Sequence, residues 1–277
     1  MKPLRIASIF LILIMIVSSF NSCKKEKDSF DDNIQPATDQ SLADNELNKI
    51  GDMMDNVAQN QSLKTQSSFL PTCAVVTIDT SSATRLITVD FGTTGCLCTN
   101  WDSKVRKGKV YLSYTGRYRQ TGYSHSIWTE NYFVNNNQHI IHKTVENRGL
   151  NASNQSTFNI TVDDTIIFTA NGGVFTWKSN RLRTWIAGES TIGLYSDDIY
   201  LIEGQGSGIT RNGKNYTVTI TEPIRVDLSC TGSHRTAGKI TIDVSGKSPI
   251  YIDYGNGNCD NVATCTINGR TYTFDPR

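Results

Sequence analysis

Residues 212–220 read Asn-Gly-Lys-Asn-Tyr-Thr-Val-Thr-Ile, a turn signal followed by alternating apolar and polar side chains. Tyr216, Val218 and Ile220 fall on one face of an extended strand, and the threonines between them fall on the other. Asn-Gly tolerates the positive φ angles of a tight hairpin turn. The segment therefore predicts a hairpin strand with one buried and one solvated face.

The same alternation recurs across the chain from about Thr72 onward, at 110–114, 158–162, 240–244 and 250–254. Further turn signals stand at 135–137, 171–173 and 268–269. Hairpins joined in this way form a meander, which must curve or fold into two sheets to bury its apolar face. We therefore expect an all-β domain over 72–277, an antiparallel meander forming either a β-sandwich or a long curved sheet.

One short amphipathic helix is expected before this domain, within 39–58. Its apolar residues recur at steps of three and four, namely Leu47, Ile50, Met54 and Val57. Asp39 is placed to cap its first turn, whereas Gly51 weakens it by ~1 kcal/mol. We expect the helix to pack on the β domain rather than to bind a partner.

The first 22 residues have the pattern of a signal peptide. Lys2 and Arg5 precede a run of about twelve apolar residues, which is too short for a membrane-spanning helix of ~20. Residues 20–23 read Phe-Asn-Ser-Cys and resemble a bacterial lipobox. That resemblance implies cleavage before Cys23 and acylation of this cysteine, which would anchor the chain in a membrane. The alternatives are an ordinary signal peptide or an uncleaved anchor.

Residues 24–60 contain four Lys and nine Asp or Glu, a net charge of −5, so that the remainder of the mature chain carries +4. The part before residue 42 has few large apolar residues and reads as a solvated tether within 23–71. Its charged run also resembles the surface-export signal of Bacteroidota lipoproteins, and Lys24 argues against retention in the inner membrane. We expect an outer-membrane lipoprotein that faces the periplasm or the cell surface.

A similar unit occurs at each end of the β domain. Residues 87–92 read Ile-Thr-Val-Asp-Phe-Gly and residues 250–255 read Ile-Tyr-Ile-Asp-Tyr-Gly, each followed by a cysteine six positions after the Asp. Another cysteine precedes each unit. This equivalence of position predicts the disulfides Cys73–Cys96 and Cys230–Cys259. The match extends downstream to residues 107–109 and 268–270, each of which leads into a further strand.

Cys98 and Cys265 remain after this assignment. They could pair with each other, or Cys98 could replace Cys96 as the partner of Cys73, because position alone does not determine connectivity. Zinc ligation is disfavoured, since one residue separates Cys96 from Cys98 and a second pair of ligands at zinc spacing is missing from the sequence. Disulfides suit an extracytoplasmic location.

The sequence carries little sign of catalysis. Nucleophile elbows, phosphate loops and dinucleotide fingerprints are all missing from it, so we expect no cofactor and no enzymatic activity. The net charge of +1 argues against nucleic acid as a partner. We expect the four histidines to lie on exposed strands or loops: His125, His139, His142 and His234.

Two groups of residues are candidate ligand sites. Trp177, Arg181, Arg183 and Trp185 share one face of a strand and could stack on a glycan, or could form a cation–π ladder that covers the sheet. A second group offers oxygen ligands for calcium, though the same residue types are common in turns. Its members are Asp253, Asn256, Asn258 and Asp260.

Several segments resemble a family of uncharacterised Bacteroidota outer-membrane lipoproteins. They are Gly108-Lys109, 114–118, 177–188, 207–218, Asp253-Tyr254-Gly255-Asn256-Gly257, Cys259-Asp260-Asn261, 263–264 and 267–269. The resemblance covers nearly all of 40–277 and implies no particular activity; Cys98 and Cys265 look like additions to the family pattern.

We therefore expect a binding or structural module of the cell envelope, one that contacts glycans or envelope proteins. The alternatives are a passive scaffold and a carbohydrate-active hydrolase. A hydrolase would need two carboxylates ~5–10 Å apart in a cleft. Its candidate acids are Asp163, Asp164, Asp197, Asp198 and Glu203.

Overall fold

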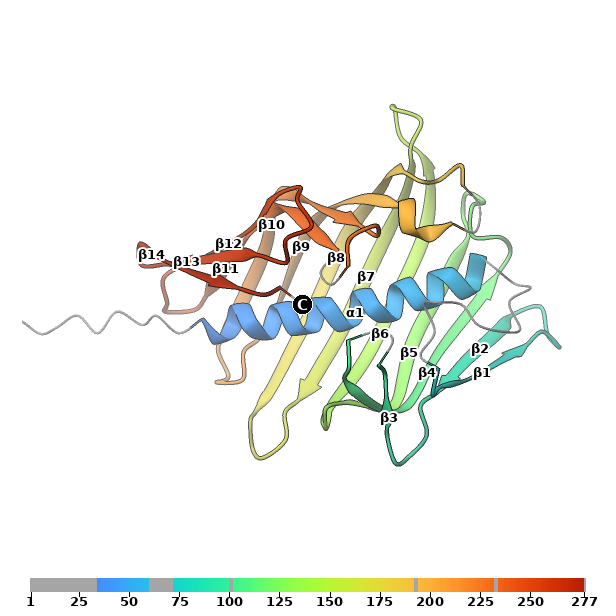
Figure 1. The fold of residues 1–277 in the computed structure, drawn as a ribbon, viewed down its shortest axis with the longest axis horizontal. Coiled ribbons are helices and arrows are strands. Elements are labelled where there is room, and N and C mark those ends of the chain that lie inside the picture. The colour runs from blue at the N-terminus through green and yellow to red at the C-terminus, as the bar shows by residue number, and fades with distance from the viewer. Residues whose placement is uncertain (1–33, 60–71, 100–101, 192–193, 232–233, 277) are drawn as a thin grey trace, which may run out of the picture. The chain divides into compact units, whose positions relative to one another are not determined.

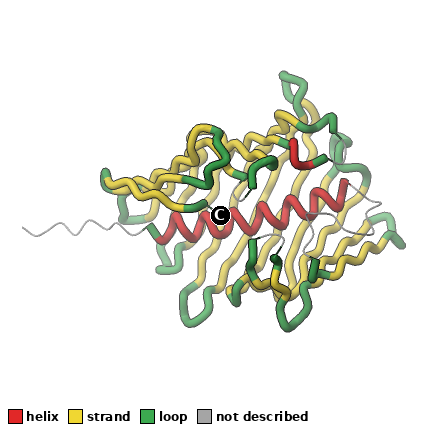
Figure 2. Tube along the Cα trace, in the orientation of Figure 1, coloured by secondary structure: helices red, strands yellow, loops and turns green. Residues whose placement is uncertain are grey.

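The computed structural model describes residues 34–59, 72–99, 102–191, 194–231 and 234–276. Within this part the chain forms one long curved sheet, and a single helix crosses the strands on the concave side (Figures 1 and 2). The predicted signal peptide, Cys23 and the tether before residue 34 lie outside the described residues. Of the two architectures expected from sequence, the curved sheet is confirmed and the sandwich is wrong.

The helix is α1 (Gln35–Gln59). The strands are β1 (Val75–Asp79), β2 (Arg85–Asp90), β3 (Cys96–Leu97), β4 (Val105–Thr115), β5 (Ser124–Val134), β6 (Asn137–Leu150), β7 (Ser156–Ile167), β8 (Val174–Ala187), β9 (Ile199–Ile209), β10 (Asn215–Asp227), β11 (Arg235–Val244), β12 (Ile250–Asn256), β13 (Ala263–Ile267) and β14 (Arg270–Phe274). A 3-10 turn, η1, spans Tyr195–Asp197.

The sheet is an antiparallel meander in which each strand pairs with its neighbour in sequence, except that β3 pairs only with β4 and β2 pairs directly with β4. Register shifts interrupt several pairs, most of all where Pro223 lies inside β10. Such bulges bend a strand and increase its twist. They help the sheet to curve around α1 rather than to remain flat.

The predicted turns are partly confirmed. Asn135 and Asn136 both have positive φ and join β5 to β6, and Asn268 and Gly269 do the same between β13 and β14. At 212–213, however, only Gly213 has positive φ, because Arg211 also belongs to the loop and makes it one residue longer. That hairpin is therefore a three-residue loop rather than a two-residue turn.

Helix α1 begins four residues before the predicted start and is longer than expected, with 25 residues. Asp39 lies inside the helix and not at its cap, which corrects the expectation for this residue. Leu47, Ile50 and Met54 are buried as predicted, whereas the side chain of Val57 lies outside the described ones. In the described part of the chain, no helix is long and apolar enough to cross a membrane.

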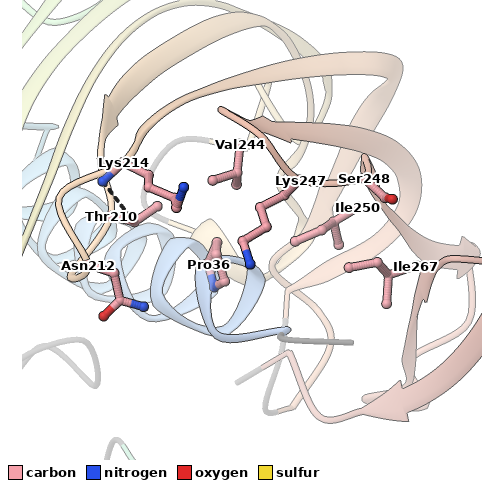
Figure 3. A pocket seen from close by; sticks show the side chains of 9 residues that line it. All are labelled: Pro36, Thr210, Asn212, Lys214, Val244, Lys247, Ser248, Ile250 and Ile267. Atoms are coloured by element: carbon pink, nitrogen blue, oxygen red, sulfur yellow. Dashed lines mark hydrogen bonds between the residues drawn. The ribbon is translucent and has the colours of Figure 1, made fainter. Parts of the chain in front are cut away.

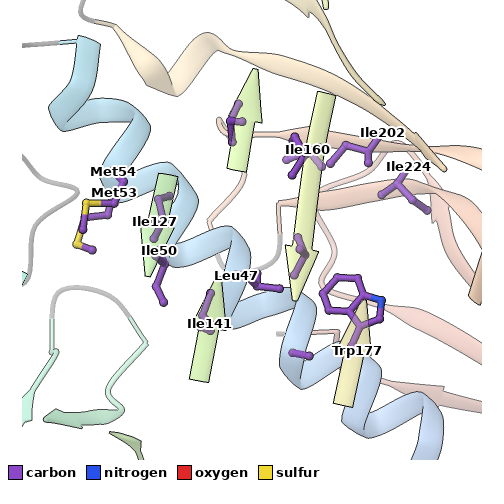
Figure 4. Packing of buried hydrophobic residues seen from close by; sticks show 14 of the residues in the cluster. Leu47, Ile50, Met53, Met54, Ile127, Ile141, Ile160, Trp177, Ile202 and Ile224 are labelled. Carbon is purple, nitrogen blue, oxygen red and sulfur yellow. The ribbon is translucent and has the colours of Figure 1, made fainter. Parts of the chain in front are cut away.

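The hydrophobic core fills the space between α1 and the concave face of the sheet. Figure 4 shows Leu47, Ile50, Met53 and Met54 of α1 in one cluster with apolar side chains of the central strands, among them Ile141. Each of these five side chains is at most 3% exposed. Burial on this scale makes the helix part of the folding core and not an appendage of it.

The two Cys-containing units share a local geometry. In each, the Asp side chain accepts a hydrogen bond from the backbone N–H of the following Gly: Gly92 to Asp90 at 2.8 Å and Gly255 to Asp253 at 2.9 Å. The extension of the match to 268–270 is wrong, because Gly269 forms the β13–β14 hairpin turn, whereas Gly108 lies in a bulge inside β4.

Candidate functional site

Acidic residues of α1 form ion pairs with arginines that project from the sheet. Each of these acidic residues is at most 6% exposed. The pairs are Asp39–Arg211, Asp44–Arg181, Glu46–Arg106 and Asp55–Arg183. These ion pairs occur along the length of the helix, between the apolar side chains that α1 contributes to the core. A helix held in this way is buried on most sides although its sequence is largely polar.

The Glu46–Arg106 pair is the most deeply buried. Arg106 donates from Nε to Oε1 at 3.0 Å and from Nη2 to Oε2 at 2.8 Å, and it also binds Asp102. Burial alone would raise the pKa of Glu46, but the charge and hydrogen bonds of Arg106 outweigh it and hold the pKa below its usual range. Glu46 is therefore ionised, and Arg106 is its counter-charge.

A second polar cluster surrounds Asp55. Its Oδ2 accepts hydrogen bonds from Arg183 at 2.7 Å and from the Tyr118 hydroxyl at 3.0 Å, while His125 Nε2 lies 3.3 Å from Oδ1. Lys143 faces the same helix turn, and the end of its side chain occupies the space that a Cβ on Gly51 would need. The glycine that weakens the helix thus makes room for a buried lysine.

The sequence-predicted ligand face is not exposed. Trp177 is fully buried and Trp185 is 2% exposed, while Arg181 and Arg183 are paired with α1. Arg181 also stacks over the Trp177 ring at 4.5 Å, as in the cation–π alternative. The four residues do share one face, but it is the concave face, and the helix covers it.

The expectation for the histidines is wrong for His125 and His139, which are each 1% exposed, whereas His142 is exposed. Their strands place them on the concave face beneath α1. Burial lowers the pKa of both to about 4, even though Asp55 faces His125 and Glu46 faces His139. Both imidazoles are therefore neutral near pH 7 and serve as parts of the core.

A small cavity of about 90 Å³ lies at the start of α1, between Pro36 and the turns that follow β9 and β11 (Figure 3). Lys214 and Lys247 are among its lining residues. This volume suits a few water molecules rather than a metabolite, for which pockets are typically ~300–1,000 Å³.

A larger open groove of about 510 Å³ lies over the C-terminal strands. It is lined by Glu222, Lys239, Asp253, Gly255, Asn256, Asn258, Asp260, Val262 and Thr264. The strand registers place Glu222, Lys239, Asp253 and Thr264 in one row across β10 to β13. All four residues of the calcium candidate therefore line one groove, which also contains two further charged side chains.

The groove's charges are already paired in part. Lys239 Nζ lies 2.7 Å from Glu222 and 3.8 Å from Asp253, so an ammonium occupies the space between two of the three carboxylates. Asp253 and Asp260 each accept a backbone N–H two residues further on. These are turn and cross-strand contacts, and they favour the turn interpretation of this segment over a calcium site.

The acids proposed for a hydrolase do not gather in either cavity. Asp163 pairs with Lys178 on the solvated face, while Asp164 is buried on the concave face. Asp198 accepts hydrogen bonds from Trp185 and Tyr200, and burial raises its pKa to about 6.

Both predicted disulfides are present, Cys73–Cys96 and Cys230–Cys259. Cys98 and Cys265 are buried free thiols, so the suggestion that they pair with each other is wrong. In the described residues, one group of three His, Cys, Asp or Glu side chains brings its ligand atoms within 4.8 Å of one another: Cys73, Cys96 and Cys98.

Sequence reasoning missed the acids of α1 as partners of the sheet, and with them Arg106 and Arg211. A signal was present, because residues 24–60 carry −5 and residues 61–277 carry +4. Opposite charges on two segments of one chain predict that the segments dock.

No family model matches the chain, and neither a curated protein nor a solved structure matches it.

Proposed function

We propose that the mature chain is an outer-membrane lipoprotein that binds a neutral glycan in the groove over β10 to β13. The anchor rests on the signal-like segment, on Cys23 and on the resemblance to Bacteroidota lipoproteins. The two disulfides are consistent with an oxidising compartment.

The observation that carries the glycan proposal is the polarity of the groove beside an exposed aromatic ring. Carboxylate, amide and hydroxyl groups line it, and these are the groups that hydrogen-bond sugar hydroxyls. Tyr251 is 53% exposed and lies two residues before Asp253, on the same face of β12. Its ring is available to pack against the apolar face of a sugar.

The charge of the groove selects among glycans. Glu222, Asp253 and Asp260 outnumber Lys239, so the groove repels an acidic chain and suits an uncharged one. The concave Arg and Trp residues would have suited an acidic glycan, but α1 covers them. The partner is therefore a hydroxyl-rich neutral polymer of the cell envelope or its surroundings.

One observation favours the hydrolase as a second candidate. Glu222 and Asp253 both lie close to the ammonium of Lys239. Their carboxylates are therefore no further apart than the ~5–9.5 Å that separates the two catalytic carboxylates of glycosidases. Lys239 would have to release one of them for general acid catalysis. If cleavage occurs, Glu222→Gln will abolish the release of reducing ends, whereas binding alone leaves the glycan intact.

A glycan array tests the groove. Tyr251→Ala should reduce binding about tenfold, the equivalent of roughly 1.4 kcal/mol. Leu150→Ala, which truncates a side chain 61% exposed on β6, is the matched control and should bind like the wild type. Equal binding by both variants would contradict the groove, and a wild type that binds no glycan would leave the passive scaffold.

Fractionation of cells tests the anchor independently. Cys23→Ala should move the protein from the membrane fraction to the soluble fraction, because the acyl chains provide most of the membrane affinity. A variant that still sediments with membranes would contradict the lipoprotein assignment without affecting the result of the array.

A further inference from the structure

Three sulfur atoms meet at the first end of the sheet. Cys73 lies just before β1, Cys96 belongs to β3, and Cys98 follows two residues later. All three Sγ atoms lie within 4.8 Å of one another. Two of them form the disulfide and the third is a thiol, so a nucleophile and an electrophile of thiol–disulfide exchange are in place together.

The sulfur of Cys73 lies beside the segment that joins the two buried cysteines. Its Sγ is 3.4 Å from the carbonyl oxygen of Leu97, the residue that separates Cys96 from Cys98. Cys73 is exposed, whereas Cys96 and Cys98 are buried. The exchange would therefore move the bond of the exposed Cys73 from one buried sulfur to another that lies within 4.8 Å of it.

The thiol of Cys98 lies beside one cation, Arg106, and the two carboxylates that pair with it. Its thiol donates to the carbonyl oxygen of Cys96 at 3.6 Å, and Arg106 hydrogen-bonds to it from β4. Burial raises the pKa of Cys98, the Arg106 guanidinium opposes this rise, and the carboxylates of Asp102 and Glu46 add to it. The thiolate is thus scarce near neutral pH and forms beside a cation when the pH increases.

We propose that Cys73, Cys96 and Cys98 form an internal thiol–disulfide exchange site in which Cys73 is bonded alternately to Cys96 and to Cys98. Cys98 loses its proton, and its Sγ attacks Cys73 Sγ. The Cys73–Cys98 bond forms as the Cys73–Cys96 bond breaks, and the electron pair leaves on Cys96, which takes up a proton. The number of disulfides is unchanged, so the step needs no oxidant or reductant.

The exchange site is adjacent to a contact that holds α1 on the sheet. Arg106, which hydrogen-bonds Cys98, also binds Glu46 of α1. Moving the disulfide onto Cys98 removes a thiol from this cluster and leaves one at Cys96. The second disulfide has no such route, because the described residues place no third sulfur, Cys265 included, in a comparable group with Cys230 and Cys259.

Peptide mapping after alkylation in denaturant tests the proposal. The oxidised protein is incubated at about pH 6 and about pH 9, quenched with acid, labelled with a maleimide and fragmented to distinguish Cys96 from Cys98. The label should lie mainly on Cys98 at the lower pH, and the fraction on Cys96 should increase several-fold at the higher pH. Label confined to Cys98 at both pH values overturns the proposal.

Two controls separate exchange from simple reduction. In Cys98→Ser the disulfide has no internal nucleophile, so Cys96 should remain unlabelled at both pH values. Label on Cys96 of this variant would mean that an external thiol had opened the bond, which would also overturn the proposal. Cys265 should be labelled equally in all samples, since its thiol takes no part in the exchange.

Discussion

The Cys73–Cys96 unit at one end of the sheet and the Cys230–Cys259 unit at the other share a strand pair, a disulfide and an Asp–Gly turn. They differ in how they hold α1. Beside the first, Arg106 grips Glu46 with two hydrogen bonds and is fully buried. Beside the second, Arg235 lies 3.8 Å from the Asp44 carboxylate and donates a hydrogen bond to the neutral side-chain amide of Asn45. The two units are similar in local structure, but the arginine beside the first binds α1 more strongly than the arginine beside the second.

The largest difference between the ends should appear when each arginine is removed. Arg106→Met leaves the buried Glu46 without its counter-charge and should lower the free energy of unfolding by about 3–5 kcal/mol. Arg235→Met should cost less, because Asp44 keeps its 2.8 Å contact with Arg181. Urea unfolding of both variants measures this difference, and equal losses would contradict the asymmetry.

The disulfides provide the next comparison. Cys259→Ser should lower stability by about 3 kcal/mol, since the 29-residue separation closes a substantial loop. Cys96→Ser, prepared under oxidising conditions, should lose less than about 1 kcal/mol, because Cys98 supplies a replacement partner for Cys73. Thermal unfolding with and without reductant compares the two, and a matching loss in both variants would remove the distinction.

Acid should destabilise the half of the core that contains His125 and His139. Both have folded-state pKa values of about 4, below the unfolded value of 6.5. Their contribution is therefore present above pH 6.5 and is lost as the pH falls toward 4, by on the order of 2 kcal/mol each. His139→Gln should reduce this loss, whereas His142→Gln, on the exposed face, should not.

The smallest loss of stability is expected from substituting the glycine of the Asp–Gly turn, and it should be the same in both units. Gly92 and Gly255 have φ angles of +75° and +97°, and neither has atoms close enough to obstruct a Cβ. Gly92→Ala and Gly255→Ala should each cost about 1 kcal/mol, from backbone strain alone. Unequal losses in chemical denaturation would show that the shared Asp–Gly turn has different roles in the two units.

The strands and both disulfides could be predicted because they depend on local patterns: side-chain alternation and the spacing of cysteines around a repeated segment. The position of α1 on the sheet could not be predicted. Side-chain alternation shows which residues share a face of a strand, but it does not show which face of the sheet is concave. Sequence alone therefore assigns Arg181 and Arg183 to a ligand face, whereas their partners Asp44 and Asp55 lie 137 and 128 residues away in the chain.

The same distances constrain how the chain folds. Asp39 can bind Arg211 only after 172 further residues have been made, and Asn45 can bind Arg235 only after 190. Because the N-terminus is made first, α1 is synthesised before its binding surface, and its contact with Arg235 forms only once the chain has reached β11. Such non-local closure is slow, so a chain interrupted before β11 lacks the Arg235 contact of α1 and leaves part of the apolar concave face without its covering strands, a surface that chaperones bind.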